Sequence, residues 1–190
     1  MDDLKLSNHH SIMQKKNGFA PQPTPFIGRE DDLRKVQEML AVPNCRLISL
    51  VGPGGIGKTR LGIELARQAE NAFADGAYFA PLQGVTSIGQ VVATIANSVS
   101  CELYGKDDIL TQLKRHLEQK ELLLLLDNFE HLLEAANIIA ELLDAVNGLK
   151  VIVTSREVLN LRAEWVWSVM GMQFPDLIDG EVHESDSAVH

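Results

Sequence analysis

Apolar residues along the chain follow two spacings, one typical of buried strands and the other typical of helices. The clearest strand is the run Leu122-Leu123-Leu124-Leu125-Leu126, which is apolar at every position. A strand without polar alternation is typical of the middle of a parallel sheet, where helices cover both faces. Shorter apolar runs predict four further strands, at residues 46–51, 77–80, 151–153 and 165–167.

Between these strands, apolar residues recur every three or four positions, which is the spacing of a helix with one buried face. From Asp31 onward, for example, Leu33, Val36 and Leu40 share one face, and Pro43 ends the run. The same spacing predicts helices at about residues 31–41, 58–72, 88–99, 108–118 and 130–146. Strands that alternate with helices predict a doubly wound α/β domain, in which a parallel sheet lies between two layers of helices.

The two ends of the chain follow neither spacing. Residues 1–25 are polar and finish in Pro21-Gln22-Pro23-Thr24-Pro25, whose alternating prolines favour an extended linker. The pair His9-His10 is expected to lie in a solvated tail, because a metal site needs further ligands. Residues 176–190 are acidic and aperiodic, so we expect them outside the core. The sequence therefore predicts one folded domain over residues 26–175.

Composition and charge narrow the range of partners. The chain carries 17 basic and 26 acidic side chains, a net charge of −9, which argues against direct contact of this segment with nucleic acid. No apolar run approaches the roughly 20 residues that a membrane helix needs, and the first residues lack the pattern of a secretory signal. Cys45 and Cys101 have no metal-ligand spacing and are expected to be reduced thiols in a cytoplasmic protein.

The first predicted strand leads directly into the run Gly52-Pro53-Gly54-Gly55-Ile56-Gly57-Lys58-Thr59, which has the pattern of a phosphate-binding loop. Glycines are needed there because the backbone must bend around a phosphate and present several N–H groups to it. Lys58 would add a positive charge toward the β- and γ-phosphates, and the Thr59 hydroxyl would ligate Mg²⁺. The sequence therefore predicts a nucleotide site at this loop.

A carboxylate follows the leucine strand. Asp127 stands at the carboxyl end of that strand, where ligands of open α/β sheets bind, and could hold Mg²⁺ opposite Thr59 in the Walker B role. The next residue, Asn128, can orient a water but cannot accept its proton near neutral pH. Glu130 could supply the base instead, or it could cap or begin the following helix. The sequence leaves both roles of Glu130 open.

An arginine follows the fourth predicted strand, which ends in Thr154-Ser155-Arg156-Glu157. Arg156 at this edge would lie near the γ-phosphate, where its fork of N–H donors can recognise the terminal oxygens. The alternative is a surface ion pair between Arg156 and Glu157.

Four ordered segments together resemble the nucleotide-binding domain of the signal-transduction ATPases with numerous domains (STAND ATPases). They resemble most the NB-ARC-like bacterial branch that is found in large transcriptional regulators. The four segments are residues 26–30, 52–61, 122–130 and 151–156. The resemblance implies a P-loop NTPase fold, a three-layer αβα sandwich whose five parallel strands have the order 5-1-4-3-2. That order would place Arg156 between the phosphate-binding loop and Asp127.

The resemblance also implies which residues hold the nucleotide. Ile27 would contact the adenine, Arg29 would help to hold the nucleotide, and Arg156 would sense the terminal phosphate. The residues expected at the cofactor are Phe26, Ile27, Arg29, Pro53, Gly54, Gly55, Ile56, Gly57, Lys58, Thr59 and Arg60. Catalysis is assigned to Lys58, Asp127, Asn128 and Arg156, and Mg²⁺ binding to Thr59 and Asp127.

The predicted function is an ATP- or ADP-binding switch that gates the activation of a larger, regulatory protein. Hydrolysis would be Mg²⁺-dependent and slow, because Asn128 stands where much of the family has a second acid. The resemblance implies that a helical and a winged-helix domain follow this core, with residues 176–190 as their start, and that the ATP-bound form self-associates. The alternative is an actively hydrolysing AAA+-like motor or loader ATPase, which would turn over about once per second or faster.

Overall fold

One parallel sheet of five strands forms the centre of the computed structural model, which describes residues 19, 24–105 and 107–171. The strands lie in the order β2-β3-β4-β1-β5, and each neighbouring pair is parallel. Counted from the other edge this order is 5-1-4-3-2, so the expected sheet and its strand order are confirmed. The strands are β1 (Leu47–Val51), β2 (Gly76–Pro81), β3 (Leu122–Asp127), β4 (Leu149–Ser155) and β5 (Glu164–Ser168).

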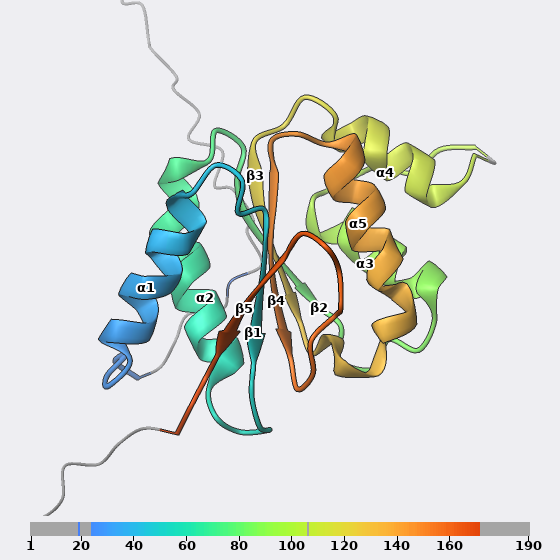
Figure 1. Ribbon diagram of the computed structural model, residues 1–190. Helices are drawn as coiled ribbons and strands as arrows, with labels where there is room; N and C mark the ends of the chain where they lie inside the picture. Colours follow the sequence, from blue (N-terminus) through green and yellow to red (C-terminus); the bar gives the residue numbers. More distant parts are fainter. Residues whose placement is uncertain (1–18, 20–23, 106, 172–190) are drawn as a thin grey trace, which may run out of the picture.

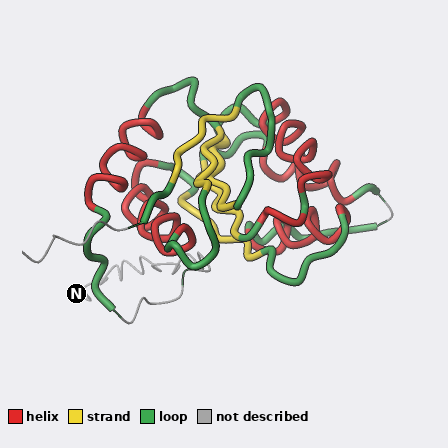
Figure 2. Tube along the Cα trace, turned by 60° about the horizontal axis from the view of Figure 1, so that its bottom comes forward, coloured by secondary structure: helices red, strands yellow, loops and turns green. Residues whose placement is uncertain are grey.

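Helices cover both faces of the sheet (Figure 1). On one side lie α1 (Glu30–Ala41) and α2 (Lys58–Ala69), and on the other lie α3 (Ile88–Ser98), α4 (Ile109–Leu117) and α5 (Ala136–Ala145). A turned view keeps the strands between these two groups of helices (Figure 2). The expected three-layer sandwich is therefore confirmed. Among the described residues, no helix is both long enough and apolar enough to cross a membrane.

The two faces of β3 pack into different apolar clusters. Leu122, Leu124 and Leu126 belong to the cluster on the side of α3, α4 and α5. Leu123 and Leu125 belong to the cluster on the side of α1 and α2. All five side chains are completely buried, and burial of one leucine stabilises a fold by about 1.5–3 kcal/mol. A strand with no solvated face needs no polar alternation, which explains the leucine run.

The segment after β3 differs from the helix predicted over residues 130–146. The helix α5 begins only at Ala136, and two 3₁₀ turns precede it, at Phe129–His131 and Leu133–Ala135. The predicted start of this helix is therefore wrong by six residues, and the other four helices lie close to their predicted positions.

Burial of one aromatic ring accounts for this difference. Asn128 takes a left-handed conformation, with φ at 64°, which turns the chain sharply as it leaves β3. The Phe129 side chain can then enter the core, where it is completely buried, and Leu132 follows it into the same cluster. Tight turns bring both side chains inward at a spacing that also fits a helix. As a consequence, Glu130 lies in a turn at the edge of the sheet.

The terminal segments lie mostly outside the described residues. Of the linker expected over residues 1–25, only Phe19, Thr24 and Pro25 are described, and the acidic tail expected over residues 176–190 lies wholly outside. The ring of Phe19 packs near that of Phe79 in β2, with 6.1 Å between the ring centroids.

The turn before β4 provides a test of how closely β3 and β4 are joined. The Gly148 carbonyl accepts a hydrogen bond from the Leu122 N–H at 3.1 Å, and a Cβ on Gly148 would lie only 2.4 Å from the Lys120 carbonyl oxygen. We expect Gly148→Ala to lower the free energy of unfolding by about 1–3 kcal/mol, because backbone must move to admit the methyl group. Chemical denaturation of both proteins measures this difference.

Gly89→Ala in α3 is the matched control, since no atom lies within 4 Å of the added methyl group. Its free energy of unfolding should be unchanged or slightly higher, because alanine favours helix more than glycine does. Equal losses in the two variants would contradict the role given to the turn at Gly148.

Candidate nucleotide-binding site

The phosphate-binding loop joins β1 to the start of α2 (Figure 1). Gly57, the last residue before the helix, has a φ of 98°, a left-handed conformation that favours glycine. Gly52 is required for a different reason, because a Cβ there would lie 2.6 Å from the carbonyl oxygen of Val169. The loop is therefore shaped by its own turns and also by the chain that leaves β5.

Lys58 and Thr59 begin α2, and the first turn of this helix carries no acidic side chain. The first N–H groups of a helix have no partners within the helix, so they favour an anion. Lys58 is only 8% exposed, and its ammonium donates to the carbonyl oxygens of Gly52 at 2.8 Å and Pro53 at 2.9 Å. These bonds hold the charged end of Lys58 across its own loop.

The environment of Lys58 contains charges of both signs. Burial lowers the pKa of the Lys58 ammonium; the charge of Glu130 opposes this shift, and the charge of Arg156 adds to it. The negative charge of Glu130 thus partly offsets the repulsion between the two cations, Lys58 and Arg156.

The two residues predicted to bind Mg²⁺ are in direct contact. The Thr59 hydroxyl donates to Asp127 Oδ1 at 2.7 Å, and the Thr154 hydroxyl donates to the same oxygen at 2.5 Å. Thr154 Oγ1 in turn accepts from the backbone N–H of Asn128 at 3.0 Å. Sequence reasoning missed Thr154, although a polar residue that ends an apolar strand beside Asp127 was a usable signal.

The donors at this point suit Mg²⁺. Magnesium prefers oxygen ligands and binds through one or two protein groups together with waters and phosphate oxygens. The hydroxyl of Thr59 and the carboxylate of Asp127 supply such oxygens, and the hydroxyls of Thr59 and Thr154 both bind Oδ1 of that carboxylate and not Oδ2. Among the described residues, no group of three or more His, Cys, Asp or Glu side chains could hold a metal ion without a substrate.

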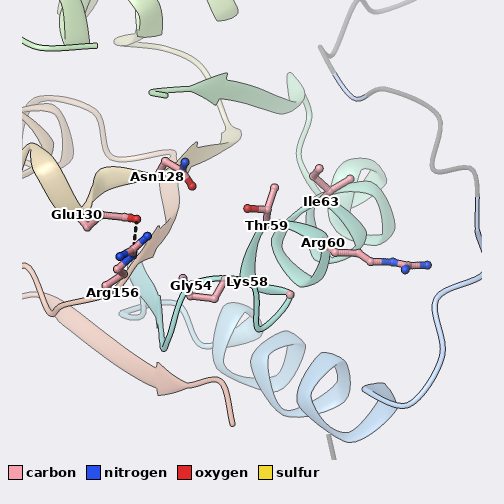
Figure 3. A pocket seen from close by; sticks show the side chains of 10 residues that line it. Gly54, Lys58, Thr59, Arg60, Ile63, Asn128, Glu130 and Arg156 are labelled. Carbon is pink, nitrogen blue, oxygen red and sulfur yellow. Dashed lines mark ion pairs between the residues drawn. The ribbon is translucent and has the colours of Figure 1, made fainter. Parts of the chain in front are cut away.

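The arginine after β4 pairs with the glutamate after β3. Arg156 Nε lies 3.2 Å from Glu130 Oε1, the ion pair drawn in Figure 3. The terminal nitrogen Nη2 of Arg156 lies over the loop, 3.2 Å from the position of a Cβ on Gly54. Glu130 thus lies in a 3₁₀ turn and not at the start of the long helix that follows. The ion pair of Arg156 is with Glu130 and not with Glu157, and the contact of Arg156 with the γ-phosphate stays a prediction.

These groups surround one cavity of about 430 Å³ (Figure 3). It lies between the phosphate-binding loop, the start of α2 and the residues that follow β3 and β4. Its lining residues are Gly54, Gly55, Gly57, Lys58, Thr59, Arg60, Ile63, Asn128, Glu130 and Arg156. The cavity brings together most of the predicted phosphate-side residues, and Asp127 lies directly behind Thr59.

Arg29 does not line this cavity. Its guanidinium is 8% exposed and donates to the carboxylate of Asp32 and to the carbonyl oxygens of Ile56 and Met170, at 2.9, 2.6 and 2.9 Å. Arg29 therefore ties the start of α1 to the phosphate-binding loop and to the chain after β5. Its expected contact with the nucleotide stays a prediction.

The remaining predicted residues lie near the loop. Ile27 is 72% exposed and Phe26 packs against the cluster on the side of α1 and α2. Arg60 lines the cavity, and its guanidinium also donates to the carbonyl oxygens of Thr24 at 2.8 Å and Pro25. Arg60 thus holds the segment that leads to Ile27.

Comparison with known proteins gives a family and several relatives. A family model described as the NB-ARC domain matches residues 29–162. Over 132 residues the chain is 39% identical to a "Putative HTH-type transcriptional regulator" of Mycobacterium tuberculosis, a match that covers 69% of this chain and 15% of the relative. Over 147 residues it is 33% identical to an "Uncharacterized protein" of the same species, with 77% and 37% covered. The chain spans well under half of the length of both relatives.

Solved structures share the fold. A STAND protein with a tetratricopeptide repeat sensor from Pyrococcus horikoshii aligns with a TM-score of 0.53 at 20% identity, over 79% of this chain and 24% of its own. The ORC2 protein of Aeropyrum pernix, solved in ADPNP-ADP complexes, aligns with a TM-score of 0.54 at 16% identity, over 81% and 50%. The family match spans the phosphate-binding loop and the ends of β3 and β4, and the chain belongs to the NB-ARC domain family.

Proposed function

We propose that this chain is the ATP- and ADP-binding switch domain of a STAND-type ATPase within a larger, regulatory protein. The observation that carries this proposal is the convergence of four groups on one cavity: the Lys58 ammonium, the Thr59 hydroxyl, the Asn128 amide and the Arg156 guanidinium. Lys58 and Arg156, two of the three cations that line the cavity, lie beside a helix N-terminus, and this arrangement favours a polyphosphate over a neutral ligand. The nucleotide phosphates would therefore lie along the loop, between Lys58 and Arg156.

Thr59 and Asp127 are the residues that would hold Mg²⁺. When bound, the ion supplies positive charge that offsets the charge of the phosphates. Thr154 supports this role because its hydroxyl fixes the Asp127 carboxylate on the side of β4. Two hydroxyls, one from α2 and one from β4, would thus keep one oxygen of Asp127 in a constant place.

Slow hydrolysis is expected because of the residue after Asp127. The backbone of Asn128 is held by Thr154, and its side chain lines the cavity, where an amide can orient a water but cannot take its proton. The nearby carboxylate of Glu130 is already engaged through Oε1 in the ion pair with Arg156. A site with this arrangement favours retention of ATP over rapid turnover.

ATP differs from ADP only by its γ-phosphate, so a site that switches between the two nucleotides must respond to that group. A ligand shifts a conformational equilibrium only by its differential affinity for the two states. Arg156 leaves β4 and lies over the loop at Gly54, so contact with the γ-phosphate is assigned to it. In this proposal ADP holds an inactive form, and ATP favours an active form that self-associates through further domains of the protein.

The first test of the site is removal of the loop lysine. We expect Lys58→Ala to weaken binding of Mg·ADP and Mg·ATP roughly tenfold to a hundredfold, because a charge-assisted contact with phosphate is worth about 1.5–3 kcal/mol. Isothermal titration calorimetry measures both affinities. Lys114→Ala is the matched control, since Lys114 pairs with Glu141 away from the cavity. Unchanged affinities in Lys58→Ala would rule out this loop as the phosphate site.

The second test is the rate of turnover. A switch should hydrolyse ATP far more slowly than about 1 per second, the lower end of ordinary enzyme turnover. A steady-state assay of released phosphate, with and without Mg²⁺, measures this rate. Turnover in the ordinary enzyme range would instead support an actively hydrolysing motor or loader ATPase.

The third test concerns the nucleotide that the larger protein carries. If ADP holds its inactive form, the purified protein should release ADP on denaturation, in a ratio approaching one per chain, as quantified by chromatography of the released nucleotide. Absence of adenine nucleotide from active and inactive preparations alike would refute the switch.

A further inference from the structure

Nucleotide binding does not by itself explain why Arg156 is paired with a carboxylate. Glu130 is the one carboxylate among the residues that line the cavity, and its Oε1 lies 3.2 Å from Arg156 Nε. The glutamate side chain is 22% exposed and the arginine side chain is 64% exposed. An ion pair with so exposed a partner contributes little to stability, so the function of this pair must be sought elsewhere.

The atoms that form the pair are informative. A guanidinium has N–H donors on Nε and on both terminal nitrogens, in one fixed plane. Glu130 takes the Nε position, and Nη2 lies over the phosphate-binding loop at Gly54. The ion pair at Nε, drawn in Figure 3, therefore restrains the guanidinium on one side, while Nη2 remains over the loop.

The ion pair also reduces the repulsion between the two cations Lys58 and Arg156. Lys58 and Arg156 line the same cavity, and each would repel the other without an anion between them. The negative charge of Glu130, with Oε1 3.2 Å from Arg156 Nε, offsets part of this repulsion. Both cations can then face one ligand.

The position of Glu130 lowers the stability of the fold. Its second oxygen, Oε2, is buried and has no hydrogen-bond partner in the described part of the chain. A buried carboxylate oxygen without a partner destabilises the fold, so an unsatisfied group of this kind calls for a functional explanation.

We infer that Glu130 is a positioning residue for Arg156, and that it sets the preference of the site for a nucleoside triphosphate over the diphosphate. This inference rests on the proposed function, because it concerns the same nucleotide site. Glu130 acts through Arg156 and does not touch the nucleotide. Its removal leaves the loop and Lys58 in place, so the diphosphate contacts remain, whereas the contact with the γ-phosphate loses its fixed geometry.

The test compares affinities for two nucleotides in four proteins. The wild type, Glu130→Gln, Arg156→Gln and the double variant are titrated with Mg·ADP and with the slowly hydrolysed analogue Mg·ATPγS by calorimetry. Glu130→Gln should reduce the preference for the triphosphate by about tenfold with Mg·ADP affinity unchanged, the effect of one weakened charge-assisted contact. In the Arg156→Gln background the same change should have no further effect, because the two residues act as one unit.

Glu134→Gln is the matched control. Glu134 lies in the next 3₁₀ turn and is not among the residues that line the cavity. This variant should keep the wild-type preference for the triphosphate. Equal weakening of both nucleotides by Glu130→Gln would indicate a merely structural role and overturn the inference.

Three other results would overturn it as well. Tighter triphosphate binding by Glu130→Gln would mean that Glu130 competes with the γ-phosphate for Arg156. Slower hydrolysis with both affinities unchanged would make Glu130 a catalytic base. A wild-type chain that binds neither nucleotide would overturn the proposed function together with this inference. The first two results would overturn the inference alone.

Discussion

The carboxylate of Asp127 joins three elements at the edge of the sheet. Asp127 ends β3, and its Oδ1 accepts the hydroxyl of Thr59 from α2 and the hydroxyl of Thr154 from β4. A carboxylate that is only 9% exposed needs such partners, because burial of an unpaired charge is strongly unfavourable. One oxygen atom therefore joins the first turn of α2 to the ends of β3 and β4, and the remainder of the site is arranged around it.

The parallel sheet explains why charged groups from distant parts of the chain meet at the cavity. All its strands end at the same edge, so residues that are far apart in the sequence are delivered to one place. Each cation there has partners of its own: loop carbonyls for Lys58, the ion pair with Glu130 for Arg156, and the carbonyls of Thr24 and Pro25 for Arg60. Groups held in this way need little rearrangement when a charged ligand binds, which is the physical advantage of a preorganised polar site.

Local patterns allowed much of the fold to be predicted, whereas contacts between distant residues did not follow from them. The leucine run of β3 specified a strand buried on both faces, and the glycine-rich loop specified its own turns. The bonds of Arg29 to Ile56 and Met170 span 27 and 141 positions, and no local spacing encodes them. The helix expected from residue 130 was wrong because successive tight turns can bury Phe129 at the same spacing as a helix.

The chain that leaves β5 is in direct contact with the phosphate-binding loop. The Val169 N–H donates to the Val51 carbonyl at 2.7 Å, the Val169 carbonyl leaves no room for a side chain on Gly52, and the next residue, Met170, accepts from Arg29. The outgoing chain is thus fastened to both ends of the loop within two residues. A displacement of the loop is therefore transmitted directly to Val169 and Met170, where the chain leaves β5.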